Sequence, residues 1–355
     1  MNLYSVIVVI TVALLAVTII DICTNRVIDK KMKKYSVLVC ILIAMATLCE
    51  WTGIKTNGAA TSLITLHKFV KLLEFCLAPL ICTAAALSYT KIRYPRFVTL
   101  VTSAHIIFQV LSLHYGLVIN VDNANLYHRG KLYPIYIAVF SLSIIYCFLA
   151  LMRDEIEHYT RPTLMLLATL CFTGFGIGIQ MIHSELRVDY ICIAIGNYFL
   201  YNHRCRMILQ LDGLTYLFNR RCYEKDIERI GSPTMVISMD LNRFKHINDT
   251  YGHATGDFYL KATADILRAT FGKYGYCYRY GGDEFFVLLT KKIGQTEALC
   301  RKFQDEIRVR QTTDDIFPDI SIGYALYDGK TGHIQKAIET ADEMMYNIKK
   351  KYKNE

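Results

Sequence analysis

The distribution of apolar residues limits what this chain can fold into more than any other feature. Seven stretches approach or reach the roughly 20 mostly apolar residues that a helix needs to cross a bilayer. They are Leu3–Ile20, Tyr35–Trp51, Phe69–Tyr89, Phe97–Ile119, Tyr133–Met152, Thr163–Ile182 and Asp189–Tyr201. The first has no basic segment before it and no small-residue cleavage site, so we interpret it as a helix and not as a signal peptide. We predict an N-terminal all-α polytopic membrane bundle of about seven helices, in which the last span is the shortest.

Basic residues follow every second stretch and predict the orientation of the bundle. They are Arg26, Lys30, Lys31, Lys33 and Lys34 after the first, Lys91, Arg93 and Arg96 after the third, and Arg153 and Arg161 after the fifth. Loops rich in Lys and Arg stay in the cytoplasm. The N-terminus is therefore expected outside, and an odd number of spans places Arg204, Arg206 and everything after them inside. This predicts a multi-pass protein of the cell membrane, in contact with membrane lipid.

The sequence changes character after about residue 204, which predicts two domains. Residues 1–204 would be a membrane sensor domain, and residues 205–355 would be a cytoplasmic domain of ordinary size. From Cys205 onward there are 23 Lys and Arg against 21 Asp and Glu, so most of the net charge of +9 lies in the membrane part. The positive-inside rule explains this surplus, and we expect no nucleic acid partner. The 12 cysteines have no C-x-x-C spacing and are interpreted as apolar packing residues.

Several polar or small residues within the membrane part leave two interpretations open. Glu74, His105 and His114 lie in or near spans, where ionisable groups are costly and often functional, so each serves either packing or sensing. Gly174-x-x-x-Gly178 favours close helix packing over ligand binding. The polar segment Asn120 to Lys131 is placed to meet an external ligand, whose identity the sequence does not give.

The cytoplasmic part contains a strand that ends in an acid. The apolar run Met235–Met239 predicts a buried strand that delivers Asp240 at its end. The following segment to His253 is rich in Asn, Gly and His, and we interpret it as a nucleotide-binding turn before a helix that Gly256 and Asp257 open and that runs through Ala269. Backbone N–H groups at such a helix start point outward and suit phosphate binding.

A glycine turn follows between two β-rich runs. Tyr276–Tyr280 and Phe285–Leu289 flank Gly281-Gly282-Asp283-Glu284, which predicts a hairpin. Glycine permits positive φ, and its lack of a Cβ lets a triphosphate approach the backbone. If the hairpin lies beside the strand that ends in Asp240, then Asp240, Asp283 and Glu284 form a carboxylate cluster. Hard carboxylate oxygens next to a nucleotide favour Mg2+.

From Leu211 to Asn354 the chain closely resembles the GGDEF family of diguanylate cyclases. The resemblance rests on five ordered blocks: Asp212-x-Leu214-Thr215, Asp240 to Asp257, Gly281-Gly282-Asp283-Glu284-Phe285, Ser321-Ile322-Gly323, and Ala341 to Lys349. It implies an α/β domain with a mostly antiparallel, palm-like sheet covered by helices. It also implies that two GTP molecules are condensed into cyclic di-GMP with release of two pyrophosphates. The membrane part more weakly resembles seven-helix regions of bacterial receptors, through Leu72-Leu73-Glu74, Pro79 and Leu87-Ser88-Tyr89-Thr90.

The resemblance also implies roles for individual residues. Asp240, the Leu241 carbonyl and Asp283 would bind Mg2+, or Mn2+ as an alternative, and Glu284 would complete the metal cluster. Asp283 would also accept the proton of the ribose 3′-OH. Lys245 would offset charge that develops in the transition state.

Further residues would bind GTP. Asn248 and Asp257 would read the guanine edge, with His253 nearby on the nucleotide. Lys349 would hold the phosphates, and Lys353 occupies the place of a usual phosphate-binding Arg. Because each site binds one GTP, catalysis would require a homodimer.

Three departures from the family pattern carry expectations of their own. Tyr216 stands where the family usually has Gly, which affects local turn geometry. Asn242 replaces a frequent Asp and would remove one negative charge from the rim of the site. Gly272-Lys273-Tyr274-Gly275 stands where an inhibitory R-x-x-D site often lies, so we predict no product inhibition through that site.

Other functions remain as alternatives. One is a catalytically silent receptor for GTP or a cyclic dinucleotide. Replacement of Asp240, Asp283 or Glu284 by other residue types would favour it, but all three acids are present. Another is a transporter or channel with an appended regulatory domain, for which intramembrane charge is sparse. A mixed GMP–AMP product is opposed by Asp257, because we expect a buried carboxylate there to accept from guanine N1–H and N2–H2 but to oppose the N1 acceptor of adenine.

Overall fold

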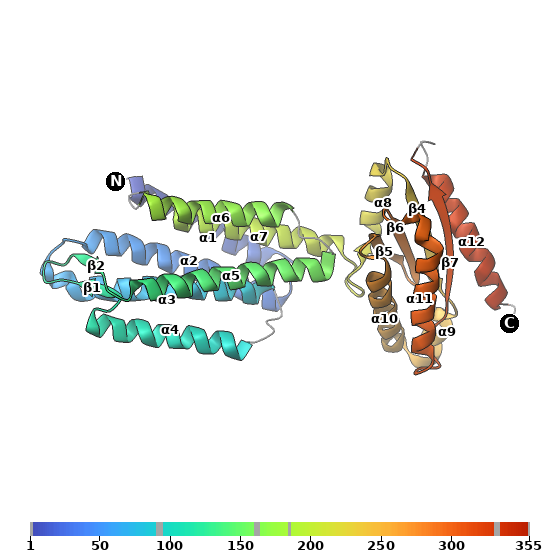
Figure 1. Cartoon of the computed structure of the whole chain (residues 1–355), viewed down its shortest axis with the longest axis horizontal. Coiled ribbons are helices and arrows are strands. Elements are labelled where there is room, and N and C mark those ends of the chain that lie inside the picture. The colour runs from blue at the N-terminus through green and yellow to red at the C-terminus, as the bar shows by residue number, and fades with distance from the viewer. Residues whose placement is uncertain (1–2, 90–94, 160–163, 184–185, 330–333, 354–355) are drawn as a thin grey trace. The chain divides into compact units, whose positions relative to one another are not determined.

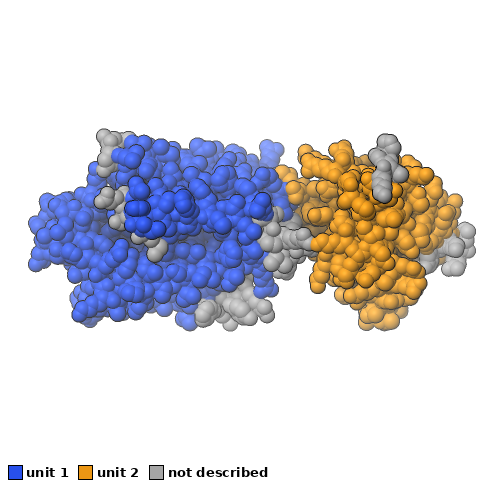
Figure 2. Space-filling view, turned by 45° about the horizontal axis from the view of Figure 1, so that its top comes forward, with its two compact units in different colours: residues 1–208 blue, residues 209–355 orange. Residues whose placement is uncertain are grey.

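The chain forms two compact units, residues 1–208 and residues 209–355, coloured separately in Figure 2. The computed structural model describes residues 3–89, 95–159, 164–183, 186–329 and 334–353. The first unit is helical with one small hairpin, and the second combines a sheet with helices (Figure 1).

Among the residues that the structure describes, seven α-helices begin in the first unit, at the predicted apolar stretches. They are α1 (Leu3–Thr24), α2 (Lys30–Thr56), α3 (Ile64–Tyr89), α4 (Pro95–Tyr115), α5 (Tyr133–Tyr159), α6 (Leu164–Ile182) and α7 (Asp189–Gln210), with a 3-10 turn, η1 (Thr61–Leu63), before α3. Among the described residues, five are long and apolar enough to cross a membrane, namely α1, α2, η1 with α3, α4 and α5. The apolar part of α6 is shorter, and α7 carries Asn197, Asn202 and His203. Membrane insertion is therefore supported, whereas seven spans are not confirmed.

A hairpin replaces the predicted outer end of the fourth span. Helix α4 ends at Tyr115, and Ile119 begins β1 (Ile119–Val121), which pairs antiparallel with β2 (Tyr127–Arg129). Asn125 turns the chain with φ of 60°, and its side-chain amide donates to the Thr56 carbonyl at 2.7 Å. The backbone N–H of Gly58 donates to the Asn125 carbonyl at 2.9 Å. The polar segment predicted from Asn120 to Lys131 is thus anchored on the loop between α2 and α3.

A single buried carboxylate joins four parts of the first unit. Glu50 of α2 is 1% exposed and accepts hydrogen bonds from Tyr4 of α1, from Gln180 of α6 at 3.1 Å and from Arg187, just before α7, at 2.9 Å. A buried charge is tolerated when it is paired and hydrogen-bonded, as here. The carboxylate therefore fixes how these helices meet.

The predicted packing role of two glycines is wrong for the described part of α6. A Cβ at Gly174 or Gly178 would meet no atom within 4 Å, so both face open space. A Cβ at Gly176 would lie 2.5 Å from the Cβ of Cys192 on α7. The close approach of α6 and α7 therefore occurs at the glycine between the two that the motif selected.

The second unit contains a five-stranded mixed sheet. Its strands are β3 (Phe218–Asn219), β4 (Thr234–Leu241), β5 (Gly275–Gly281), β6 (Glu284–Leu289) and β7 (Ile320–Tyr327), in the order β3-β5-β6-β4-β7. β3 pairs parallel with β5, and the other pairs are antiparallel. The helices are α8 (Arg220–Arg229), α9 (Phe244–Tyr251), α10 (His253–Phe271), α11 (Thr296–Gln311) and α12 (Gln335–Lys353), with η2 (Ile293–Gln295).

Alternating side chains of the sheet form a core on each face, because successive residues of a strand point to opposite sides. One core contains Met239 and Phe285 of the sheet with Leu267 of α10 and Phe303 of α11. The other core contains Val236, Phe286 and Leu288 with Tyr223 of α8 and Ala341 of α12. Both faces are therefore covered by helices, which Figure 1 shows on either side of the strands.

The predicted strand and hairpin are confirmed, and the predicted turn is wrong. β4 covers Met235–Met239, and β5 and β6 cover the two β-rich runs. The segment after Asp240, however, forms helix α9, because Phe244 and Ile247 are buried in the core and favour a helical repeat. Helix α10 also begins at His253, three residues before the predicted start.

Candidate active site

The three predicted acids lie at one end of the sheet, where β4 ends and β6 begins. Asp240 is opposite Glu284 in the β4–β6 register, and the N–H of Leu241 donates to the carbonyl of Asp283 at 3.3 Å. Asp240 is 5% exposed, Asp283 is partly buried and Glu284 is exposed. The strands therefore place an interior carboxylate beside two accessible ones.

The same acids fit a divalent cation on electrostatic grounds. Burial and the charges of Asp240 and Asp283 raise the pKa of Glu284 above its usual range. A cation would relieve this repulsion. Within the described residues, no three His, Cys, Asp or Glu side chains already converge as a metal centre. The Leu241 carbonyl would therefore be needed as a further oxygen ligand.

Lys349 of α12 reaches the buried acid directly. Its ammonium donates a hydrogen bond to Oδ1 of Asp240. Helix α12 packs closely on β7 at Gly323, where an added Cβ would lie 2.0 Å from the Ala341 carbonyl oxygen. The glycine of the predicted Ser321-Ile322-Gly323 block thus lets α12 approach the sheet and carry Lys349 to Asp240.

The residues predicted to bind the nucleotide lie on α9 and α10. Asn248 faces the first turn of α10, since a Cβ at Gly256 would lie 2.0 Å from its Oδ1. Asp257 follows Gly256 directly in the sequence. Asp257, His253 and Lys245 are exposed, so the burial expected for the Asp257 carboxylate is not observed.

One further predicted phosphate ligand has no described side chain. Lys353 is the last residue of α12, and its side chain lies outside the part that the structure describes. Its assignment therefore remains a prediction.

Arg279 organises the turn and was missed by the sequence reasoning. Its Nε and NH2 groups donate to the Gly282 carbonyl at 3.0 and 2.8 Å, and its NH1 group donates to Asp212 at 3.0 Å. The same Asp212 oxygen accepts from the N–H and hydroxyl of Thr215 at 2.8 and 2.7 Å. Burial opposes ionisation of Asp212, yet the bonds with Thr215 and Arg279 lower its pKa below the usual range. The opening block is thereby tied to the glycine turn.

The departures from the family pattern have distinct structural outcomes. Tyr216 has φ of 56°, a conformation that favours glycine and explains why glycine is usual there. Asn242 is 6% exposed and accepts from the Ser321 hydroxyl at 2.8 Å, so its predicted place at the rim is wrong. At Gly275 a Cβ would lie 2.2 Å from the Leu288 carbonyl oxygen. The last position of the missing R-x-x-D site therefore has no room for a side chain.

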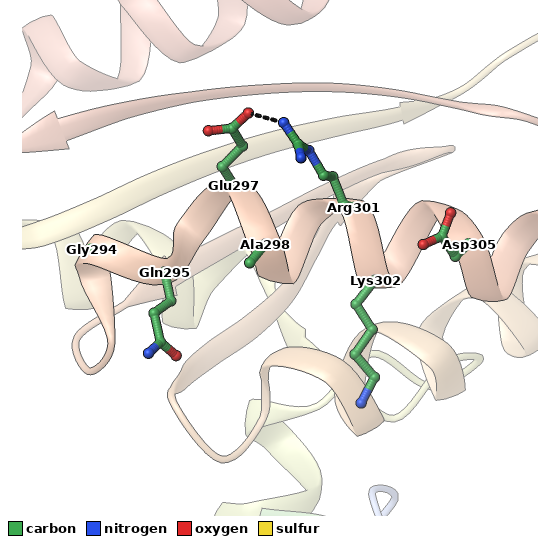
Figure 3. Close-up of a pocket in the computed structure, with 7 residues that line it drawn as sticks. All are labelled: Gly294, Gln295, Glu297, Ala298, Arg301, Lys302 and Asp305. Atoms are coloured by element: carbon green, nitrogen blue, oxygen red, sulfur yellow. Dashed lines mark hydrogen bonds and ion pairs between the residues drawn. The ribbon is translucent and has the colours of Figure 1, made fainter.

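A surface hollow in this unit lies apart from the predicted site residues. It runs along η2 and α11, and its lining residues, shown in Figure 3, are Gly294, Gln295, Glu297, Ala298, Arg301, Lys302 and Asp305. Its main feature is an exposed ion pair between Glu297 and Arg301. None of the predicted catalytic or nucleotide-binding residues line it, so we do not assign the reaction to this hollow.

Comparison with known protein families shows what this unit is similar to. Residues 209–355 match the family model described as diguanylate cyclase, GGDEF domain. The C-terminal unit is similar to GGDEF domains over its whole length. The match includes the Asp240, Asp283 and Glu284 cluster and the helix that carries Lys349.

Relatives of the GGDEF domain occur in several bacteria. The chain is 33% identical over 168 residues to diguanylate cyclase DosC of Escherichia coli, a match that covers 44% of this chain and 36% of DosC. It is 30% identical over 156 residues to diguanylate cyclase DgcS of Shewanella oneidensis, covering 42% of this chain and 52% of DgcS. The chain thus spans about a third and about half of these two relatives.

A solved structure of a GGDEF domain is also similar. The GGDEF domain of DgcB from Caulobacter crescentus, in complex with c-di-GMP, is 26% identical with a TM-score of 0.36, over 40% of this chain and 90% of that chain.

Proposed function

We propose that this chain is a membrane-bound diguanylate cyclase that condenses two GTP molecules into cyclic di-GMP under the control of its N-terminal unit. The observation that carries the proposal is the register of β4 and β6, which sets Asp240 opposite Glu284 with Asp283 beside them. The GGDEF domain, together with relatives named diguanylate cyclases, indicates the same activity.

We assign the metal ligands to the acid cluster. Asp240, the Leu241 carbonyl, Asp283 and Glu284 would hold Mg2+, with Mn2+ as the alternative. When bound, the cation supplies positive charge to the phosphates and makes the ribose 3′-OH more acidic. The raised pKa of Glu284 supports this assignment, because a cation would offset the burial and the repulsion that raise it.

The side chains of the domain carry the proton and the charge in this proposal. Asp283 accepts the proton of the ribose 3′-OH. At the same time the 3′ oxygen bonds to the α-phosphorus of the second GTP. The bond from that phosphorus to the bridging oxygen breaks, and pyrophosphate leaves with the electron pair. Lys245 offsets the charge that grows on the phosphates, and Lys349 and Lys353 hold them.

Base recognition is assigned to the start of α10 and the neighbouring face of α9. Asn248 and Asp257 read the guanine edge, and His253 lies beside the nucleotide. The exposed carboxylate of Asp257 is free to accept from guanine N1–H and N2–H2 as GTP enters, whereas adenine offers an acceptor at N1. This assignment favours GTP over ATP.

Two copies of the domain are needed in this scheme. Cyclic di-GMP contains two phosphodiester bonds, and each half-site holds one GTP. Two GGDEF domains must therefore face each other so that each nucleotide attacks the other, and we propose a homodimer in the membrane. The N-terminus lies outside and the GGDEF domain lies in the cytoplasm, as the basic residues after alternate helices indicate.

Product analysis tests the proposal. Detergent-solubilised protein and its Asp283→Ala variant are incubated with Mg2+ and GTP, and the products are separated by chromatography. We expect cyclic di-GMP from the wild type alone. Product from both proteins, or from neither, would refute the catalytic assignment. GTP binding without any product would instead identify the silent receptor.

The same assay tests feedback. Because Gly272 and Gly275 replace the charged ends of the R-x-x-D site, we expect added cyclic di-GMP to leave the initial rate unchanged at low concentration. Inhibition that a Lys273→Ala substitution relieves would contradict this prediction.

A further inference from the structure

Unpartnered polar atoms are concentrated in one part of the N-terminal unit. The described residues contain nine buried side-chain nitrogen or oxygen atoms without a hydrogen-bond partner, and five of them lie around α3 and α4. They are Nε2 of His67, the hydroxyl of Tyr127, Nδ1 of His105, and both amide atoms of Gln109. We call these four residues the α3–α4 polar cluster. An unpartnered buried polar atom destabilises the folded state, so such a concentration calls for an explanation.

The helices bring the members of the cluster together. His67, Lys71 and Phe75 are spaced four residues apart on one face of α3, over about 12 Å. His105 bonds the Phe75 carbonyl at 3.1 Å, and Gln109 lies one turn further along the same face of α4. The two α4 residues are 4% and 0% exposed. They are therefore enclosed where α4 packs on α3.

The hairpin covers the other end of this face. Asn125 lies in the turn of the hairpin, and Tyr127 is the first residue of β2. Asn125 contacts Nδ1 of His67 at 2.9 Å, and the ring of Tyr127 lies 5.2 Å from the ammonium of Lys71. Figure 1 shows β1 and β2 at the end of α3 where this contact occurs.

The hydrogen bonds of His67 and His105 determine whether their unpartnered ring nitrogens can donate or accept. The amide nitrogen of Asn125 donates to the Thr56 carbonyl, so its oxygen must accept, and Nδ1 of His67 must carry the proton. His105 likewise uses Nε2 to donate to the Phe75 carbonyl. Each neutral imidazole then presents a bare lone pair at its other nitrogen. An occupant of the cluster must therefore supply hydrogen-bond donors.

The aromatic lining favours a cationic donor. Phe75 packs against Tyr127, Tyr133 and Tyr136, with ring centroids 6.3, 6.1 and 4.4 Å apart. Tyr127 already presents its ring to an ammonium, that of Lys71. Aromatic faces attract ammonium groups, most strongly away from water. Glu74 forms an ion pair with Lys71 at 2.8 Å, so the charge of this lysine is balanced and does not oppose a second cation.

We propose that the α3–α4 polar cluster is a binding site for a small organic amine. The amino group of the ligand would donate to Nδ1 of His105 and to Oε1 of Gln109, one helical turn away, and its body would pack on Phe75 and the tyrosines around it. The inference deepens the proposed function, since it names the chemical class of the signal. It rests on that function only in that binding of the amine would control cyclase activity. Ordered water is the competing occupant of such a site.

Thermal unfolding of the full chain in lipid nanodiscs tests the proposal without any need for cyclase activity. The probes are phenethylamine and butylamine. The matched controls are propylbenzene, in which a methyl group replaces the amino group of phenethylamine, and 3-phenylpropanoate, which carries a carboxylate. We expect the amines to raise the melting temperature by about 3 °C or more at saturating concentration and the controls to have no effect.

Gln109→Leu gives the sharper result because it should not lower the melting temperature of the amine-free protein but should weaken amine binding. Removal of an unpartnered amide should leave the melting temperature of the amine-free protein unchanged or higher. The response to amine should be lost, with at least about tenfold weaker binding. Ser36→Ala is the matched control, since Ser36 on α2 also has a buried unpartnered hydroxyl but lies outside the cluster. It should keep the full response to amine.

Several outcomes would overturn the proposal. An amine-free Gln109→Leu protein that melts below the wild type would identify Gln109 as a structural residue. A stable variant together with no amine response in the wild type would identify water as the occupant. If Gln109→Leu does not fold, His105→Phe replaces it with the same expected signs. A wild-type protein that forms no cyclic di-GMP would refute the proposed function, but it would not affect the result of the binding experiment.

Discussion

Replacement of Gly323 by Ala tests how closely α12 must pack on the sheet for Lys349 to reach Asp240. The added Cβ would lie 2.0 Å from the Ala341 carbonyl oxygen and 2.4 Å from the Met345 nitrogen. Ordinary contact begins at 3.4 Å, so helix and strand must separate by about 1.4 Å. Overpacking of this kind costs about 1–3 kcal/mol, or about 3–10 °C in melting temperature for a domain of this size.

The same displacement should reduce activity more than stability. Lys349 is four residues beyond Met345 and moves with the helix. A misplacement of about 1 Å can lower a rate by about 100-fold, so we expect a loss of about 10- to 100-fold in kcat/KM for GTP. Pyrophosphate release measures the rate, and circular dichroism of the full-length protein measures the melting temperature.

The control variants follow from the same geometry. A Cβ at Gly231 would meet no described atom within 4 Å, so Gly231→Ala should change neither quantity. The atoms that clash at Gly323 belong to the backbone, and a second substitution, Met345→Ala, should therefore not restore activity. An unchanged melting temperature and rate in Gly323→Ala, or rescue by Met345→Ala, would refute this account of α12.

Three further substitutions probe the turn and its surroundings. Arg279→Ala removes the donors to the Gly282 carbonyl and should lower kcat by about 10-fold or more in the pyrophosphate assay, whereas Arg301→Ala, which breaks an exposed pair, should have no effect. Tyr216→Gly relieves a left-handed residue and should raise the melting temperature by about 2–4 °C, and a decrease would contradict the assigned strain. The pKa of Glu284 is raised, so the folded state binds its proton more tightly and stability is lost as pH rises through that pKa. Glu284→Gln should therefore melt above the wild type at pH 8 but not at pH 4, in the absence of metal, while it loses cyclase activity.

The strands and the turn that carry the three acids were predictable because local sequence patterns determine them. The run Met235–Met239 is apolar and β-branched enough to indicate a buried strand, and two glycines between β-rich runs indicate a hairpin. Once both were placed in one sheet, Asp240, Asp283 and Glu284 were expected at the same end of it. The structure confirms these elements, whereas the roles of the acids in catalysis stay predictions.

Other features depend on tertiary contacts and were not predictable in the same way. The composition of α9 favours a turn, but burial of Phe244 and Ile247 stabilises a helix there. The residue type of Arg279 does not distinguish it from other charged residues of strands. Its role arises because the fold brings Asp212 beside it. Arg279 stands two residues before Gly281 in the sequence, a signal that could have suggested contact with the turn.

The central position of β4 has a consequence for the range of ions that the site accepts. Asp240 is held between two ladders, with β6 on one side and β7 on the other, and cannot shift without breaking backbone pairs. Glu284 is exposed at the first position of β6, and its longer side chain can rotate to follow an ion. One fixed and one adjustable carboxylate would let the site accommodate cations of different radius, so substitution of Mn2+ for Mg2+ should change affinity less than loss of either acid.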